Sequence, residues 1–231
     1  MMRRVGILGG MGPEATVLLM QKIIAAVPAR DDADHIPLIV DQNSQVPSRI
    51  ARLIEGRGDD PAPVLVAMAQ RLEVAGAEAL AMPCNTAHHY ADEIRAAVRI
   101  PFLDMVAASA QAARRLAQTG AKVGLLASPA VARVGLFDRA LGAVGLSVIH
   151  PEDGAGMLAA IRSIKAHGPN DDARAALLGQ SQALLAKGAQ VQLIACTEFS
   201  LIPDAVSPEV QAIDTLDVLV AEVVRFARLS G

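Results

Sequence analysis

The chain alternates short apolar segments of strand length with longer amphipathic segments of helix length. The strand-length segments cover residues 4–10, 36–41, 77–83, 100–104, 122–128, 145–150, 191–196 and 210–214. Near-continuous apolar strands separated by helices are typical of a mostly parallel sheet that helices cover on both faces. We therefore predict an α/β fold with eight strands, which fall into two sets of four.

Apolar residues recur at helical spacing in two of the intervening segments. The first set is Val17, Met20, Ile24 and Val27, and the second is Leu65, Met68, Leu72 and Ala75. Both sets step by three, four and three residues, which predicts two amphipathic helices with these residues on their buried faces.

The two sets of strands also resemble each other in sequence. VGILGG at Val5 recurs as VGLLAS at Val123, GAEALAMPCNT at Gly76 recurs as GAQVQLIACTE at Gly188, and PFLD recurs as QAID. Three matches in the same order, with offsets of 118, 112 and 110 residues, indicate an internal duplication. We expect two similar α/β domains, each with a mostly parallel four-stranded sheet, related by a pseudo-twofold internal repeat. The first would comprise residues 1–104 plus a C-terminal helix at about 215–231, and the second residues 105–214.

Composition excludes several classes of partner. The 231 residues are 52% apolar and only 2% aromatic, and 24 acidic against 21 basic side chains give a net charge of −3. A chain with few aromatic rings and no basic stripe lacks the means to stack bases or bind phosphate backbones, so we expect no nucleic-acid partner. Its apolar runs are interrupted well before the ~18 residues that predict a membrane span. We therefore expect a cytoplasmic protein that does not bind membranes.

The first strand leads into GGMGPEAT, residues 9–16, where glycines allow a tight turn and Pro13 suits the start of a helix. A strand-to-helix turn of this kind can bind an anion, because the helix N-terminus presents unpaired N–H donors. Gly10, Gly12 and Ala15 also fit the looser dinucleotide fingerprint G-x-G-x-x-A, with Asp41 as a ribose partner. A nucleotide-binding module is therefore one alternative function.

The two cysteines, Cys84 and Cys196, occupy matching positions at the ends of the third strand of each half. One interpretation is two inert buried thiols. The other is functional, because ligands bind at the carboxyl ends of parallel strands and a helix N-terminus favours the thiolate. If the halves face each other, both sulfurs point into one cleft. Removing a proton from one face of an α-carbon and returning it on the other takes two such acid/base groups.

The constellation of GGMGPEAT, CNT at Cys84 and CTE at Cys196 resembles the cofactor-independent aspartate/glutamate racemase family over the whole chain. The glycine loop and Glu198 after the second Cys-Thr are more similar to the aspartate racemases than to the glutamate racemases. The resemblance implies that Cys84 and Cys196 racemise an acidic amino acid without a cofactor, with aspartate as the expected substrate. It also implies a homodimer.

The resemblance further implies which residues bind the substrate. Met11, Asn85 and Thr86 would hold the α-carboxylate, Thr197 would contact it from the other side, and Arg49 with Lys165 would bind the side-chain carboxylate. The full set of predicted substrate-binding residues is Gly10, Met11, Gly12, Arg49, Asn85, Thr86, Lys165, Thr197 and Glu198. No metal site is expected, because the five histidines form no set with ligand spacing. His88 is expected to cap or pack one turn after Cys84.

Other functions stay open on the sequence. Within the same superfamily they are a hydantoin or broad amino-acid racemase and a maleate isomerase-like enzyme. Outside it they are the nucleotide-binding module and an amino-acid-binding module without catalysis. Exchange of the α-proton of aspartate with solvent would separate a racemase from both binding modules.

Overall fold

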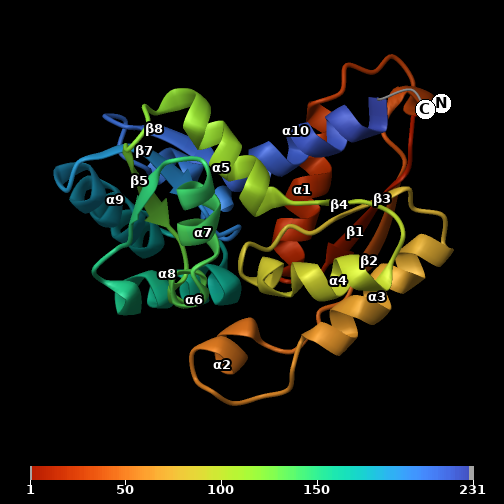
Figure 1. Cartoon of the computed structure of the whole chain (residues 1–231), viewed down its shortest axis with the longest axis horizontal. Helices are drawn as coiled ribbons and strands as arrows, with labels where there is room; N and C mark the ends of the chain where they lie inside the picture. The colour runs from red at the N-terminus through yellow and green to blue at the C-terminus, as the bar shows by residue number, and fades with distance from the viewer. Residues whose placement is uncertain (1, 229–231) are drawn as a thin grey trace. The chain divides into compact units, whose positions relative to one another are not determined.

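The computed structural model describes residues 2–228 of the chain (Figure 1). The chain divides into two compact units, of which unit 1 comprises Met1–Met105 with Leu216–Gly231 and unit 2 comprises Val106–Thr215. The strands of unit 1 are β1 (Val5–Gly9), β2 (Leu38–Gln42), β3 (Ala79–Ala81) and β4 (Phe102–Leu103). Those of unit 2 are β5 (Lys122–Leu126), β6 (Ser147–Ile149), β7 (Ala189–Ile194) and β8 (Gln211–Asp214).

Both sheets are parallel throughout and have the same topology. The strand order is β2-β1-β3-β4 in unit 1 and β6-β5-β7-β8 in unit 2. Each of the eight predicted strand segments contains or overlaps one of these strands. The predicted fold class, two similar α/β domains with parallel four-stranded sheets, is therefore confirmed.

Helices connect the strands and cover both faces of each sheet. The helices are α1 (Pro13–Ala25), α2 (Arg49–Leu53), α3 (Ala62–Val74), α4 (Ala91–Ala97), α5 (Met105–Leu116), α6 (Pro129–Val134), α7 (Leu136–Ala143), α8 (Gly154–His167), α9 (Asp171–Ala186) and α10 (Thr215–Arg228). Short 3₁₀ helices are η1 (Asp32–Asp34), η2 (Thr86–Tyr90), η3 (Phe199–Leu201) and η4 (Pro203–Ala205). In unit 1, α1 and α10 lie on one face of the sheet and α3 and α4 on the other (Figure 1).

The side chains of each strand alternate between two buried clusters, as the pleat of a strand requires. In β1, Val5 and Ile7 join the cluster formed with α1 and α10, whereas Leu8 joins the cluster formed with α3 and α4. In unit 2, Val123 and Leu125 of β5 pack with α5 and α7, and Leu126 packs with α8 and α9. Full burial of each such side chain contributes roughly 1.5–3 kcal/mol, and burial on both faces explains why the strands are almost wholly apolar.

The helices that follow β4 and β8 are exchanged between the units. Helix α5 follows β4 of unit 1, but its own residues Val106, Ala110 and Ala113 are buried in a core of unit 2. Helix α10 follows β8 of unit 2, but its own residues Leu219 and Val223 are buried in a core of unit 1. Each unit is therefore completed by a helix that comes from the other half of the sequence.

The internal repeat extends to the packing of single residues. A Cβ on Gly6 of β1 would lie 2.9–3.2 Å from atoms of Leu72, Ala77 and Leu80. A Cβ on Gly124 of β5 would lie 3.0–3.2 Å from the equivalent residues, Leu184, Ala189 and Gln192. In both units the glycine lets the covering helix, α3 or α9, approach the central strand closely.

One prediction about α1 is wrong in detail. The helix is present and begins at Pro13, but its buried face is formed by Leu19 and Ile23 rather than by Val17 and Ile24, which are 47% and 53% exposed. Apolar residues occur all around this helix, so the spacing is compatible with more than one buried face. For α3 the prediction holds at Leu65, Met68 and Leu72, whereas Ala75 lies at the exposed C-terminal cap.

Candidate functional site

Cys84 lies at the carboxyl end of β3 and is a buried free thiol, 7% exposed. The strand ends at Ala81, and the Cys84 N–H then donates a hydrogen bond to the Met82 carbonyl at 2.8 Å, which turns the chain sharply. Asn85 is buried next to it, and η2 begins at Thr86. The predicted triplet Cys84, Asn85 and Thr86 therefore sits at the strand end where α/β proteins bind ligands.

His88 fixes the main chain around Cys84. Its Nδ1 lies 2.8 Å from the Cys84 carbonyl, and its Nε2 accepts the N–H of Met105 at 3.1 Å. Because Nε2 is an acceptor, Nδ1 carries the proton and donates it to the carbonyl. Burial lowers the pKa of His88, consistent with this neutral ring. The prediction that His88 caps or packs one turn after Cys84 is confirmed as packing, since the ring is buried and bonds to main-chain groups, and its link to the start of α5 is an addition.

The loop after β1 brings Met11 into the same buried cluster as Cys84. Gly10 has φ +90° and a Cβ there would lie 2.3 Å from the Asn43 main chain, so only glycine fits. Its N–H donates to Thr16 Oγ1 at 2.9 Å. Gly12 is the N-cap of α1. Unit 1 therefore places the predicted residues Gly10, Met11 and Gly12 at the carboxyl edge of the sheet that also carries Cys84.

Arg49 begins α2 and folds back onto its own loop. Its Nη1 donates to the carbonyls of Val46 at 3.3 Å and Pro47 at 2.9 Å, while the side chain of Ser48 caps α2 by accepting the Ala51 N–H. Val46 belongs to the buried cluster that contains Cys84 and Met11. The Arg49 Nε is buried and finds no acceptor within residues 2–228. Such a donor suits an anionic ligand.

Cys196 occupies the equivalent place in unit 2, two residues beyond β7, and is also a buried free thiol. Its Sγ donates a hydrogen bond to Glu198 Oε2 at 2.9 Å, and Glu198 Oε1 pairs with Lys165 Nζ at 2.8 Å. Thr197, which lies between Cys196 and Glu198 in the sequence, is also buried. Three predicted site residues, Cys196, Glu198 and Lys165, therefore form one connected group.

The electrostatic environment favours the protonated form of Cys196. Burial raises the pKa of the Cys196 thiol well above its ordinary value, and the charge and hydrogen bond of Glu198 raise this pKa further, while Lys165 acts in the opposite direction. The expectation that a helix N-terminus would favour the Cys196 thiolate is therefore wrong. The element that follows, η3, spans only three residues, so its dipole is too small to outweigh burial and Glu198.

Sequence reasoning placed Glu198 among the substrate contacts but missed its hydrogen bond to the thiol. The spacing of the two residues in the chain does not by itself predict this side-chain contact. Sequence reasoning also missed Tyr90, which lies in the buried cluster with Cys84 and Met11. The Tyr90 hydroxyl is buried without a hydrogen-bond partner among the described residues.

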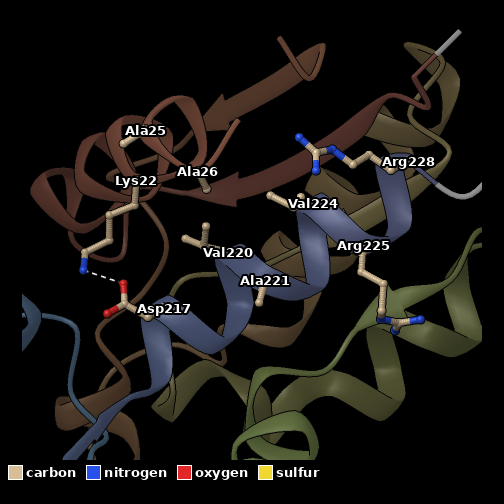
Figure 2. Close-up of a pocket in the computed structure, with 9 residues that line it drawn as sticks. All are labelled: Lys22, Ala25, Ala26, Asp217, Val220, Ala221, Val224, Arg225 and Arg228. Atoms are coloured by element: carbon tan, nitrogen blue, oxygen red, sulfur yellow. Dashed lines mark hydrogen bonds and ion pairs between the residues drawn. The ribbon is translucent and has the colours of Figure 1, made fainter. Parts of the chain in front are cut away.

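A surface cavity of about 650 Å³ lies elsewhere in unit 1, between α1 and α10 (Figure 2). Apolar residues such as Val220 and Val224 form its floor, and Lys22 and Asp217 are paired at its edge (Figure 2). None of the predicted site residues lines it.

The nucleotide alternative relied on Asp41, whose carboxylate instead accepts hydrogen bonds from Arg71 of α3 at 2.7 and 3.1 Å. Within the described residues no cluster of His, Cys, Asp or Glu is arranged to hold a metal ion. No helix of residues 2–228 is both long enough and apolar enough to cross a membrane.

Known proteins match this chain over most of its length. A sequence model of the Asp/Glu/Hydantoin racemase family matches residues 8–223. The chain belongs to this family. The broad specificity amino-acid racemase RacX of Bacillus subtilis (strain 168) is 26% identical to it over 220 residues, which are 91% of this chain and 92% of that protein.

Two solved structures of similar proteins share the fold over nearly the whole chain. The aspartate racemase of Picrophilus torridus has 26% sequence identity and a TM-score of 0.81, covering 99% of this chain and 96% of its own. A putative Asp/Glu racemase from Yersinia pestis has 26% identity and a TM-score of 0.76, covering 99% and 100%. The matched placement of Cys84 and Cys196 makes these two thiols the first candidates for catalysis.

Proposed function

We propose that this member of the racemase family interconverts the enantiomers of aspartate without a cofactor, with Cys84 and Cys196 as its two acid/base groups. The observation that carries the proposal is the matched placement of the two thiols. Each is buried, and each follows the third strand of a sheet with the same strand order. The similarity to the Picrophilus torridus aspartate racemase supports aspartate as the substrate.

In the proposed reaction one cysteine, as thiolate, takes the α-proton, so that the Cα–H bond breaks and an S–H bond forms. The other cysteine, as thiol, then gives its proton to the opposite face of the carbanion, so that its S–H bond breaks and a new Cα–H bond forms. No electrons are gained or lost overall. After one turnover the protonation states of Cys84 and Cys196 are reversed, and the enzyme is ready for the other enantiomer.

The carbanion intermediate carries negative charge that spreads into the α-carboxylate, so donors around that group lower the barrier. We assign this role to Met11, Asn85 and Thr86 in unit 1 and to Thr197 in unit 2. The burial of Met11, Asn85 and Thr197 supports the assignment, because a water-poor site strengthens each hydrogen bond.

Arg49 is the proposed determinant of substrate class. Two of its hydrogen bonds hold the guanidinium against its own loop, and its buried Nε has no hydrogen-bond partner among the described residues. A side-chain carboxylate would supply that acceptor. Arg49 would thereby select aspartate or glutamate over neutral amino acids.

The test is exchange of the α-proton of L- and D-aspartate in D₂O, followed by NMR, together with the change in optical rotation. Wild-type protein should give both signals. Cys84→Ala and Cys196→Ala should each lower racemisation by about 10²–10⁴-fold, the usual contribution of a positioned acid or base. Unchanged racemisation in either variant would eliminate the two-thiol mechanism.

A broader substrate range is the second candidate, because the Bacillus subtilis relative is described as a broad specificity amino-acid racemase. A panel of aspartate, glutamate and neutral amino acids, assayed with wild type and Arg49→Gln, decides between them. If the protein is an aspartate racemase, Arg49→Gln should lower the racemisation rate for acidic substrates selectively. Equal rates across the panel would favour the broad-specificity enzyme. The implied homodimer is tested by sedimentation of the purified chain.

A further inference from the structure

The two cysteines differ in what stands two residues after each of them. The repeat aligns Cys84, Asn85 and Thr86 with Cys196, Thr197 and Glu198, so a neutral hydroxyl in unit 1 corresponds to a carboxylate in unit 2. Glu198 is buried, 7% exposed, and its Oε2 lies 2.9 Å from the Cys196 Sγ. A two-thiol racemase is chemically symmetric in principle, and this carboxylate removes the symmetry.

We propose that Glu198 is a positioning residue that holds Cys196 as the thiol, so that Cys196 is the proton donor of the pair in the resting enzyme. The proposal rests on the racemase function proposed above. The geometry behind it is the S–H group of Cys196 donating to one carboxylate oxygen while the other oxygen pairs with Lys165.

The physical reason is the charge that appears when Cys196 loses its proton. Loss of that proton breaks the S–H bond and leaves a thiolate about 3 Å from the Glu198 carboxylate, and two like charges at that separation repel strongly in a buried site. The same loss also removes the hydrogen bond. Both effects favour the thiol over the thiolate.

Lys165 limits this preference. Its ammonium group lies 2.8 Å from Glu198 Oε1, the oxygen that the thiol does not bond, and neutralises part of the carboxylate charge. Burial raises the pKa of Cys196, Glu198 raises it further, and Lys165 lowers it. Among the described residues, Glu198 from the same loop and Lys165 from α8 are the charged groups found to act on this thiol. The thiolate at Cys196 is thus disfavoured but attainable during turnover, and once formed it is a strong base.

The asymmetry has a consequence for turnover. The form with the thiol at Cys196 is favoured, so the enantiomer that receives its new proton from Cys196 meets the enzyme in its ready state. The opposite enantiomer meets a minor form. Glu198 would therefore bias the two directions to different kcat and KM values while leaving the equilibrium between the enantiomers unchanged.

The experiment measures alkylation of Cys196 by iodoacetamide in the Cys84→Ser chain, which contains one thiol, without substrate. Glu198→Gln keeps the shape and a hydrogen-bond acceptor but removes the charge, and a charged neighbour shifts a pKa by about 1–3 units. A lower pKa also weakens the nucleophile, with a Brønsted slope of about 0.45. The net expectation is alkylation about 3- to 50-fold faster at pH 8.

Lys165→Met gives the opposite sign and keeps the test independent of folding. Loss of the ammonium charge should slow alkylation about 3-fold, which corresponds to a pKa rise of about one unit. A loosened fold would instead accelerate alkylation in both variants. Glu209→Gln, an exposed carboxylate of unit 2, is the matched control and should leave the rate unchanged.

Acceleration in Glu198→Gln with slowing in Lys165→Met supports the proposal. Equal rates in all variants, or acceleration in both, would overturn it. Because the alkylation experiment uses no substrate, its outcome is separate from that of the deuterium-exchange assay. If the two variants change the alkylation rate in opposite directions but the protein does not racemise aspartate, the proposed function fails and the pairing of Cys196 with Glu198 stands. If the protein racemises aspartate but the alkylation rates do not change, only the role of Glu198 fails.

Discussion

Replacing His88 by alanine removes the side chain that ties Cys84 to the start of α5. The ring donates to the Cys84 carbonyl and accepts the Met105 N–H, and both main-chain groups lie in a buried region. Each buried polar group left without a partner costs about 1–3 kcal/mol. Loss of the ring, which packs 5.3 Å from the Phe102 ring, leaves a cavity as well. We expect the free energy of unfolding to fall by about 3–5 kcal/mol.

The same contacts predict how stability depends on pH. The folded pKa of His88 is lowered by burial, so the unfolded chain binds a proton that the folded chain does not. The contribution of His88 to stability is therefore fully present above its unfolded pKa of about 6.5 and is lost as the pH falls toward the folded pKa. The slope contributed by this one proton is at most about 1.4 kcal/mol per pH unit.

Urea denaturation followed by circular dichroism from pH 5 to pH 8 measures both effects. His89→Ala is the matched control, because the adjacent ring is exposed and its removal should change the free energy of unfolding by less than about 0.5 kcal/mol. His88→Gln should reduce the acid-side slope relative to wild type. The reasoning is refuted if His88→Ala costs less than 1 kcal/mol or if the slope is the same in wild type and His88→Gln.

Three further predictions concern unit 2, and urea midpoints measure all of them. Gly142→Ala should raise the free energy of unfolding by about 0.5–1 kcal/mol, because the position is helical and a Cβ there meets open space. Gly124→Ala should lower the free energy of unfolding by about 1–3 kcal/mol through overpacking. Equal effects of the two substitutions would contradict this reasoning. Gln192→Leu should cost about 1–3 kcal/mol, because it removes the acceptor of the buried Ser181 hydroxyl and a donor to the Ser181 carbonyl, and a neutral result would show that the hydroxyl finds another acceptor. Asn170→Ala removes the side-chain cap of α9 and should cost about 1 kcal/mol, with no loss expected if the cap is dispensable.

The strands were predictable because their signal is local. Segments such as 4–10 and 122–128 are apolar along their length, and burial on both faces of a parallel sheet requires that composition. The buried face of α1 was not predictable in the same way. Leu18, Leu19, Ile23 and Ile24 leave more than one apolar stripe, and contact with α10 and β1 selects Leu19 and Ile23.

The candidate site shows the same division. Its residue types and their order along the chain were available from the motifs around Cys84 and Cys196, and from the resemblance of both to a racemase family. The side-chain partners were not available from motifs. His88 bridges to Met105, and Arg49 turns back onto its own loop, because the folded main chain brings these groups within hydrogen-bond distance.

By itself the sequence determined the two-fold repetition, the eight strands and the pair of thiols at equivalent strand ends, since each follows from residue type and spacing along a short segment. Only the tertiary structure decided that the Cys196 thiol faces a carboxylate paired with Lys165. Lys165 and Glu198 belong to different elements, far apart in the chain. Their contact depends on how α8 packs against the loop after β7, which no local pattern specifies.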